Sequence, residues 1–402
     1  MFKKKFLLLC LSLFLVFALA ACGSEAIVGD EDVPGVTEDE IKIGSFQALT
    51  GPAAPIGVPM KRGMSAYFDK LNEEGGVNGR EINLIVHDDQ FQPSRTVSGV
   101  TELVERDNVF SIVGGLGAPT SMAVMPYLEQ NNIPFVYPAG GANSFARPPK
   151  DNVFVVQPNY AVEGNIMAQF IVEDLEEEKV GLIGDDTDIG EEGREGVTNK
   201  LADYEIEPVE SVSFGADTTD YTSHVTRLRN AGAEVVVIHT TAQEAASIVT
   251  TARDMDYHPK FITTYSLADP IMFDLAGEAW NDVYAAAWLD PIDFDDPNPG
   301  VERFLTTLEE YYPNERSYSY AAAGWVAAEV FTEAVRRMGD DITRENLIET
   351  METFEGWDGE LAYDVEFGPG LREGVRSMYF MQGVDGDFEI ETDWIDYDSD
   401  NN

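Results

Sequence analysis

The sequence predicts an α/β protein made of two doubly wound, mostly parallel sheets. From residue 41 onward, short apolar runs alternate with longer segments of helical periodicity, and the alternation starts afresh after residues 153–157. Such alternation favours parallel strands with helices on both faces of the sheet. The chain has 402 residues, 44% of them hydrophobic, which is enough for two lobes with separate cores.

The first 40 residues are predicted to be a secretion signal followed by a tether. Three lysines precede an apolar run over residues 6–20, and Leu19-Ala20-Ala21-Cys22 follows. This layout is typical of a secretory signal, and the run is short for a transmembrane helix. Leu-Ala-Ala-Cys resembles a bacterial lipoprotein box, which implies a signal peptide over residues 1–21 and lipidation of Cys22; an ordinary signal peptide is the alternative. Residues 22–40 then form an acidic, solvated tether.

The first lobe begins with a strand, a helix with four apolar residues on one face, a second strand and a second helix. These segments are predicted at residues 41–46, around Met60, Met64, Phe68 and Leu71, at 81–86, and from Pro93. Two buried strands follow at 110–113 and 133–136, and each ends in a glycine-rich loop.

We call the two loops, residues 117–121 and 139–143, the ligand shelf. Open α/β sheets bind ligands at the carboxyl edge of their strands, where both loops are expected. Gly117 permits close backbone approach, and Pro119 opens a helix whose free amides suit a carboxylate. The alternative is that both loops are only tight turns between strand and helix.

The second lobe repeats the alternation of strands and helices. A helix is predicted from about residue 162, and strands at 179–184, 208–214, 234–239 and 260–265 with helices between them. Three further helices are predicted at 301–311, 318–338 and 343–354, and two final strands at 377–382 and 387–391. Asp385-Gly386 fits a hairpin turn between these last strands.

Composition excludes several classes of function. The net charge of −47 argues against nucleic-acid binding, which needs a basic footprint, and suggests a surface that salt stabilises. Both cysteines lie within the first 22 residues, so no disulfide or thiolate metal site is expected in the folded body. A nucleophile elbow, a paired-histidine zinc motif and a phosphate loop are missing from the sequence, so we expect no enzyme, metal or cofactor.

Acidic residues after two strands invite a catalytic or metal-binding interpretation. His87-Asp88-Asp89 follows the second strand, and Asp185, Asp186 and Asp188 follow the strand at 179–184. Hydrogen-bonded strand ends explain both groups, although the second group also lies where a cleft would be lined. Gln47 ends the first strand and is a candidate ligand contact, with an amide that caps its own loop as the alternative.

Several motifs in a fixed order carry a resemblance to a known family. They are IKIGSFQALTGPAAPIG, LNEEGGVNGREINLIVHDDQ, NNIPFVYPAGG, GLIGDDTDIGEEGREG and the helix with Gly324-Trp325. From residue 41 to 391 the chain resembles substrate-binding proteins of ABC importers in the leucine/isoleucine/valine-binding family. The resemblance implies a type I periplasmic-binding-protein fold, with lobes of residues 41–157 plus 287–356 and 158–286 plus 357–402. Three crossovers near 157, near 286 and between 354 and 377 would form the hinge.

The resemblance also implies where the ligand binds. The family holds an amino acid's carboxylate on the two shelf loops and its ammonium with polar groups from both lobes. By position, the implied contacts are Gly117, Ala118, Thr120, Ala139, Gly140 and Gly141, together with Ile189, Thr240, Thr241 and Tyr265. Two positions depart from the family pattern, because Ile189 stands where a tyrosine is common and no glutamate follows Tyr265.

The predicted function is capture of a small carboxylate outside the cytoplasm, by closure of the two lobes, for delivery to a membrane permease. The protein would be lipid-anchored at the cell surface or in the periplasm. A branched-chain or other hydrophobic amino acid is the first expectation, and an aromatic or other amine-free organic acid the second. A ligand sensor that signals to a membrane kinase and an extracellular hydrolase are the remaining alternatives.

Overall fold

The computed structural model describes residues 33–215, 217–292 and 296–397. The predicted signal peptide, Cys22 and most of the tether therefore lie outside the described residues. Across the described ranges, every helix is too short or too polar to cross a bilayer.

The first sheet has five parallel strands in the order β2-β1-β3-β4-β5. Every residue of β3 and β4 is buried, as expected for strands covered on both faces. The loops after these two neighbouring strands therefore emerge side by side at the carboxyl edge. The strands are β1 (Glu40–Gln47), β2 (Glu81–Asp88), β3 (Ile112–Leu116), β4 (Phe135–Ala139) and β5 (Val153–Phe154).

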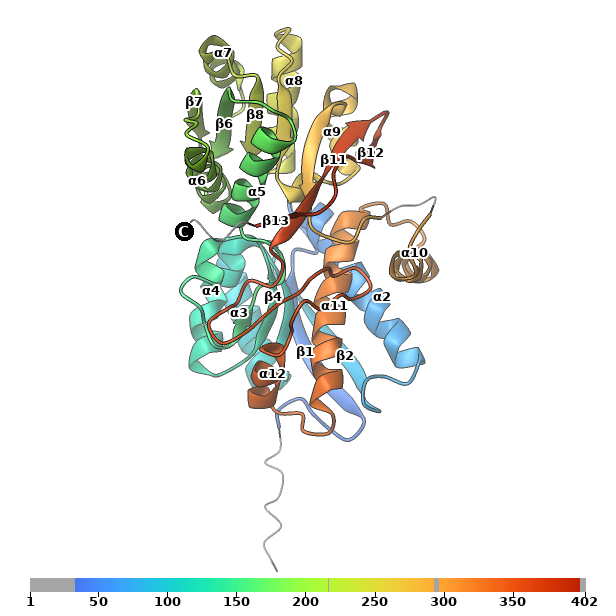
Figure 1. Ribbon diagram of the computed structural model, residues 1–402. Coiled ribbons are helices and arrows are strands. Elements are labelled where there is room, and N and C mark those ends of the chain that lie inside the picture. Colours follow the sequence, from blue (N-terminus) through green and yellow to red (C-terminus); the bar gives the residue numbers. More distant parts are fainter. Residues whose placement is uncertain (1–32, 216, 293–295, 398–402) are drawn as a thin grey trace, which may run out of the picture. The chain divides into compact units, whose positions relative to one another are not determined.

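Helices from both ends of the sequence surround this sheet. The predicted apolar face of the first long helix is confirmed, since Met60, Met64, Phe68 and Leu71 are all buried. Figure 1 shows orange α11 beside blue α2, and the two helices pack against each other. The helices are α2 (Ala54–Glu73), α3 (Pro93–Glu105), α4 (Ala118–Gln130), η1 (Asn143–Phe145), α10 (Pro299–Tyr311), α11 (Tyr318–Met338) and α12 (Arg344–Met351).

The second sheet follows the order β12-β11-β10-β9-β8-β6-β7, and within the described strands antiparallel pairing occurs only where β11 meets β10, β12 and β13. Its strands are β6 (Val180–Asp185), β7 (Glu210–Phe214), β8 (Val235–His239), β9 (Lys260–Thr263), β10 (Val283–Ala287), β11 (Ser377–Val384) and β12 (Asp387–Ile390), and β13 (Ile395–Asp396) pairs with β11. Asp385 and Gly386 have φ of 50° and 92°. These angles are those of a tight hairpin turn, as predicted.

The helices of the second lobe alternate with its parallel strands. They are α5 (Tyr160–Glu173), α6 (Asp188–Asp203), α7 (Thr222–Ala231), α8 (Ala242–Asp254), η2 (Tyr265–Leu267), α9 (Ile271–Ala276) and η3 (Gly277–Trp280). Green α6, β6 and β7 and yellow α8 gather in one part of Figure 1, and red β11 and β12 join them.

The described chain passes between the two sheets three times, after β5, after β10 and before β11. Two of these connections run together, because the amides of Gly374 and Val375 donate to the carbonyls of Val155 and Val156 at 2.7 Å. The predicted strand at 153–157 is accordingly split. Its first two residues pair with β4, and the next two pair with the returning segment. The prediction of two doubly wound lobes with three crossovers is confirmed.

Candidate functional site

The two loops of the ligand shelf lie against each other. The Gly117 amide donates a 2.7 Å hydrogen bond to the carbonyl of Ala139. A Cβ atom added to Gly140 would lie 3.1 Å from the Ala118 nitrogen. The structure therefore brings together the six shelf residues that the resemblance implied, and Gly117 has the φ of 93° that favours glycine.

Several amides of the shelf have no acceptor in the described part of the chain: Ala118, Thr120, Gly140 and Ala142. Those of α4 are first-turn amides, which lack an intrahelical partner. The Thr120 hydroxyl, in contrast, is used within its own loop, where it lies 2.9 Å from the Gly117 carbonyl. No lysine or arginine occurs between residues 111 and 146. Any anion held here is held by backbone amides.

Two tyrosines cover the second shelf loop, and we call Tyr160 and Tyr265 the tyrosine wall. Their rings stack with centroids 6.3 Å apart and planes inclined by 14°. The Tyr160 amide donates to the Gly141 carbonyl at 2.8 Å. A Cβ atom on Gly141 would lie 2.6 Å from the Tyr160 ring and 2.8 Å from the Tyr265 hydroxyl. Only glycine fits between the shelf and this wall.

A buried carboxyl group holds the loop that carries Tyr265. Glu163 of α5 is fully buried and accepts hydrogen bonds from the Tyr265 amide at 2.6 Å and the Thr264 hydroxyl at 2.9 Å. Burial raises the pKa of Glu163 to about 8. His239 Nε2 lies 3.7 Å away, and burial lowers the pKa of this imidazole to about 3, so it is neutral. Glu163 was missed from the sequence.

Thr240 and Thr241 belong to a network at the carboxyl end of β8. The buried Thr240 hydroxyl lies 2.9 Å from Asp185 Oδ2 and 2.5 Å from Glu244 Oε2. The Thr241 hydroxyl donates to Glu244 Oε2 at 2.7 Å, at the start of α8. These contacts match the strand-end interpretation of Asp185, and both hydroxyls are engaged with protein carboxylates.

Gln47 is buried and turned toward β3. Its Nε2 donates to the Gly114 carbonyl at 2.7 Å, while its Oε1 is buried without a partner among the described residues. Asp88, at the end of β2, accepts the Leu49 amide at 2.9 Å. Asp88 thus ties strand ends together, as the strand-end interpretation expected, whereas Gln47 bonds to β3 and not to its own loop.

A second-lobe carboxylate that the sequence analysis overlooked reaches the shelf. Glu192 Oε2 accepts the Asn143 amide at 2.7 Å, a bond between α6 and the second shelf loop. Half-buried Ile189 precedes Glu192 by three residues and so shares its helix face. Burial and the neighbouring acids, first among them Asp188, raise the pKa of Glu192 to about 6. This spacing from Ile189 is the signal that would have found Glu192.

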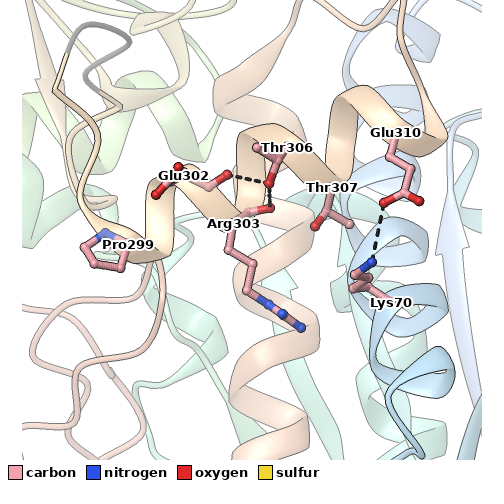
Figure 2. A pocket seen from close by; sticks show the side chains of 7 residues that line it. All are labelled: Lys70, Pro299, Glu302, Arg303, Thr306, Thr307 and Glu310. Carbon is pink, nitrogen blue, oxygen red and sulfur yellow. Dashed lines mark hydrogen bonds and ion pairs between the residues drawn. The ribbon is translucent and has the colours of Figure 1, made fainter.

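A surface hollow of about 310 Å³ lies elsewhere, between α2 and α10. Figure 2 shows Lys70 of α2 facing Glu310 of α10, and their charged groups are 3.4 Å apart. Arg303, also in its lining, is paired with Glu74 at 2.8 Å. Its cations are thus already neutralised, and it contains no shelf residue, so we do not assign the ligand to it. Within the described residues, no cluster of histidine, cysteine and acidic side chains could hold a metal ion.

Comparison with known proteins places these features in a family. The model of the periplasmic binding protein family matches residues 40–387. The Leu/Ile/Val-binding protein homolog 7 of Brucella abortus (strain 2308) is 25% identical over 367 residues, which cover 86% of this chain and 90% of that relative.

Solved structures share the fold over nearly the whole described chain. A branched-chain amino acid ABC transporter protein from Thermus thermophilus with bound valine has a TM-score of 0.80 and 21% identity, and covers 90% of this chain and 97% of its own. A fatty acid ABC transporter substrate-binding protein from Thermomonospora curvata has a TM-score of 0.79 and 23% identity, with coverage of 90% and 94%. These likenesses confirm the type I periplasmic-binding-protein fold.

Proposed function

Since this chain belongs to the periplasmic binding protein family, we propose that it is the solute-binding component of an ABC importer and captures a small carboxylate outside the cytoplasm. One observation carries the proposal. Amides that lack an acceptor among the described residues lie in two adjacent loops at the carboxyl edge of the first sheet, next to side chains of the second lobe. Backbone amides at a helix start bind anions without any positive side chain.

A hydrophobic amino acid is the first candidate ligand. Ile189 and the tyrosine wall place an aliphatic and two aromatic side chains on the second-lobe side of the shelf. The Brucella relative is named for leucine, isoleucine and valine, and the Thermus structure holds valine. Apolar walls with a few fixed polar groups are the usual composition of such sites.

An amine-free carboxylic acid is the second candidate. The shelf amides recognise only the carboxylate, and the tyrosine wall carries no charge that would select an ammonium group. Tyr265 instead directs its hydroxyl to Gln157, 2.5 Å from that side-chain nitrogen. The Thermomonospora protein, whose printed name specifies a fatty acid, has a similar fold at low identity.

Capture by closure of the two lobes, followed by release to a membrane permease, completes the proposal. The two lobes are in contact beside η2, where the Tyr320 hydroxyl donates to the Ser266 carbonyl at 2.9 Å. Opening and closing of the lobes would break and make such contacts. Hinge motion about a few crossovers is the usual form of such closure. Lipidation of Cys22 would keep the protein at the outer face of the membrane, with residues 22–40 as its tether.

Calorimetry on matched carboxylates and amides tests the function. L-Leucine is compared with L-leucinamide, and 4-methylpentanoate with its amide. We expect each amide to bind at least about tenfold more weakly, because charge-assisted hydrogen bonds are roughly twice as strong as neutral ones. Equal affinity for the acid and the amide in both pairs would show that the shelf does not bind the carboxylate.

A further inference from the structure

We propose that Glu192 binds the ammonium group of the ligand and thereby selects amino acids over amine-free acids. This inference rests on the proposed function, because it places the ligand carboxylate on the shelf amides. It assigns the choice between the two candidate ligands to one side chain of the second lobe.

The position of Glu192 is fixed from two sides. Its helix packs closely on α5, since a Cβ atom on Gly196 would lie 2.4 Å from the Ala161 carbonyl oxygen. Its Oε2 is held by the Asn143 amide at 2.7 Å. A carboxylate anchored in this way loses little further freedom when it binds a ligand, so its interaction is preorganised.

The free oxygen of Glu192 lies beside the amides that would hold a carboxylate. Ala142, whose amide lacks an acceptor in the described chain, directly precedes Asn143. Consecutive Cα atoms are about 3.8 Å apart, so a carboxylate on this amide is one residue from the Glu192 carboxylate. An α-ammonium group is separated from its own carboxylate by a single carbon. The two charges of an amino acid thus match the two groups.

The charge of Glu192 is uncompensated in the described protein. Ion pairs to Lys, Arg or His within 4.0 Å are found for many acidic residues here, but none is found for Glu192 among the described residues. The groups that act on it are the carboxylates of Asp188, Glu195 and Glu191 on its own helix, which oppose its ionisation. A ligand cation would relieve this repulsion, whereas a second anion alone would add to it.

Three neighbouring carboxyl groups are already occupied. Glu163 accepts from Thr264 and Tyr265, and it is buried behind that loop. Asp185 and Glu244 share the Thr240 hydroxyl. Asp186 and Asp188 are exposed, and no bond ties either side chain to the shelf within the described residues. Glu192 is bonded to the shelf and has one oxygen without a hydrogen-bond partner there, so it is the acceptor that we assign to an ammonium group.

Calorimetry with two matched ligand pairs tests the assignment on the full chain. The pairs are L-leucine with 4-methylpentanoate, and L-phenylalanine with 3-phenylpropanoate. The variant Glu192→Gln keeps an oxygen that can accept the Asn143 amide but loses the charge. Glu191→Gln, at the exposed neighbouring position, is the matched control.

We expect Glu192→Gln to weaken an amino acid by roughly 10-fold to 100-fold, the usual contribution of a hydrogen bond to a charged group, and its amine-free partner by less than about threefold. Glu191→Gln keeps the Glu192 charge and removes one of the carboxylates that oppose it, so it should weaken neither ligand. An equal loss of affinity for both members of a pair would show that Glu192 only joins the two lobes. Unchanged affinity for the amino acid would show that Glu192 does not contribute to binding. Either result overturns the assignment.

The comparison of carboxylates with amides in wild-type protein keeps this test separate from that of the function. If the amides bind as well as the acids, the shelf proposal fails whatever Glu192 does. If the acids bind more tightly but Glu192→Gln treats both members of a pair alike, only the role of Glu192 fails. Wild-type protein that binds none of the four acids rejects both.

Discussion

The two sides of the candidate site are built from different chemistry. The shelf of the first lobe consists of backbone amides in glycine-rich loops and has no titratable side chain between residues 111 and 146 except Tyr127, Glu129 and Tyr137. The facing surface of the second lobe consists of side chains, among them Tyr160, Glu192 and Tyr265. One side is set by local loop geometry, the other by contacts between distant segments.

This difference separates two tasks in recognition. Amides in fixed loops bind any small carboxylate and change little with pH, because they carry no proton that titrates in the physiological range. Side chains on the opposite lobe distinguish ligands with the same carboxylate, and their protonation couples the site to pH. Changes on the shelf should therefore weaken every small carboxylate alike, and changes on the facing surface should alter the preference among carboxylates or the pH dependence.

The largest effect is expected at Gly141, where the two sides touch. In Gly141→Val, the added Cβ would lie 2.6 Å from the Tyr160 ring and 2.8 Å from the Tyr265 hydroxyl, so the loop or the wall must move. Overpacking of this kind costs about 1–3 kcal/mol, which corresponds to roughly 10-fold to 100-fold in affinity if binding requires the undisplaced loop. Calorimetry with the tightest-binding acid measures the loss.

Gly368→Val is the matched control for this variant. A Cβ atom on Gly368 meets no heavy atom within 4 Å, and the residue lies outside the shelf. It should bind as the wild type does, and both variants should retain the far-ultraviolet circular dichroism of the fold. Full affinity in Gly141→Val would show that the shelf does not hold the ligand where we place it.

A pH-dependent effect on stability is expected from Glu163 of the second lobe. Its pKa rises from 4.5 to about 8 on folding because the carboxyl group is buried. The folded state then keeps a proton that the unfolded state has lost, so this stabilisation is fully present below pH 4.5 and is lost as the pH rises through 8. In Glu163→Gln, the unfolding free energy should fall less between pH 5 and pH 8 than in the wild type.

Urea denaturation at the two pH values measures this difference. Glu207→Gln removes an exposed carboxylate of the same lobe and should leave the change in unfolding free energy between the two pH values as in the wild type. The unfolding free energy of Glu163→Gln should still fall somewhat between the two pH values, because burial also raises the pKa of Glu329 to about 8. If the unfolding free energy changed equally with pH in Glu163→Gln and in the wild type, Glu163 would be ionised in the folded protein.

The shelf was predictable from sequence because its information is local. The sequence predicted buried strands at 110–113 and 133–136, each followed by glycines. These segments correspond to β3 and β4, whose loops meet at the carboxyl edge of the sheet. The long helix at 318–338 was also predicted to its observed bounds. Apolar periodicity and glycine placement record these features directly.

The facing surface was only partly predictable because distant contacts define it. Glu192 stands in an acidic helix that resembles a solvated face, and its partner Asn143 is 49 residues away in sequence. Glu163 and the Tyr265 amide are 102 residues apart. The split of the strand at 153–157 depends in the same way on a returning segment near residue 374. Ile189 and Tyr265 were found only through the family resemblance.

The smallest effect on affinity is expected at Tyr265. Variants of this residue test whether the tyrosine wall contributes to ligand binding through its rings or through the Tyr265 hydroxyl. Tyr265→Phe keeps the stack on Tyr160 and removes the bond to Gln157 at 2.5 Å. A single neutral hydrogen bond contributes about 0.5–1.5 kcal/mol net to fixing the ring in place, so affinity should fall by at most roughly twofold to tenfold. Tyr265→Ala, which also removes the ring, is the companion variant and should lose more. If Tyr265→Phe lost as much as Tyr265→Ala, the hydroxyl itself would bind the ligand, and the second lobe would contribute a polar contact where we assign an apolar wall.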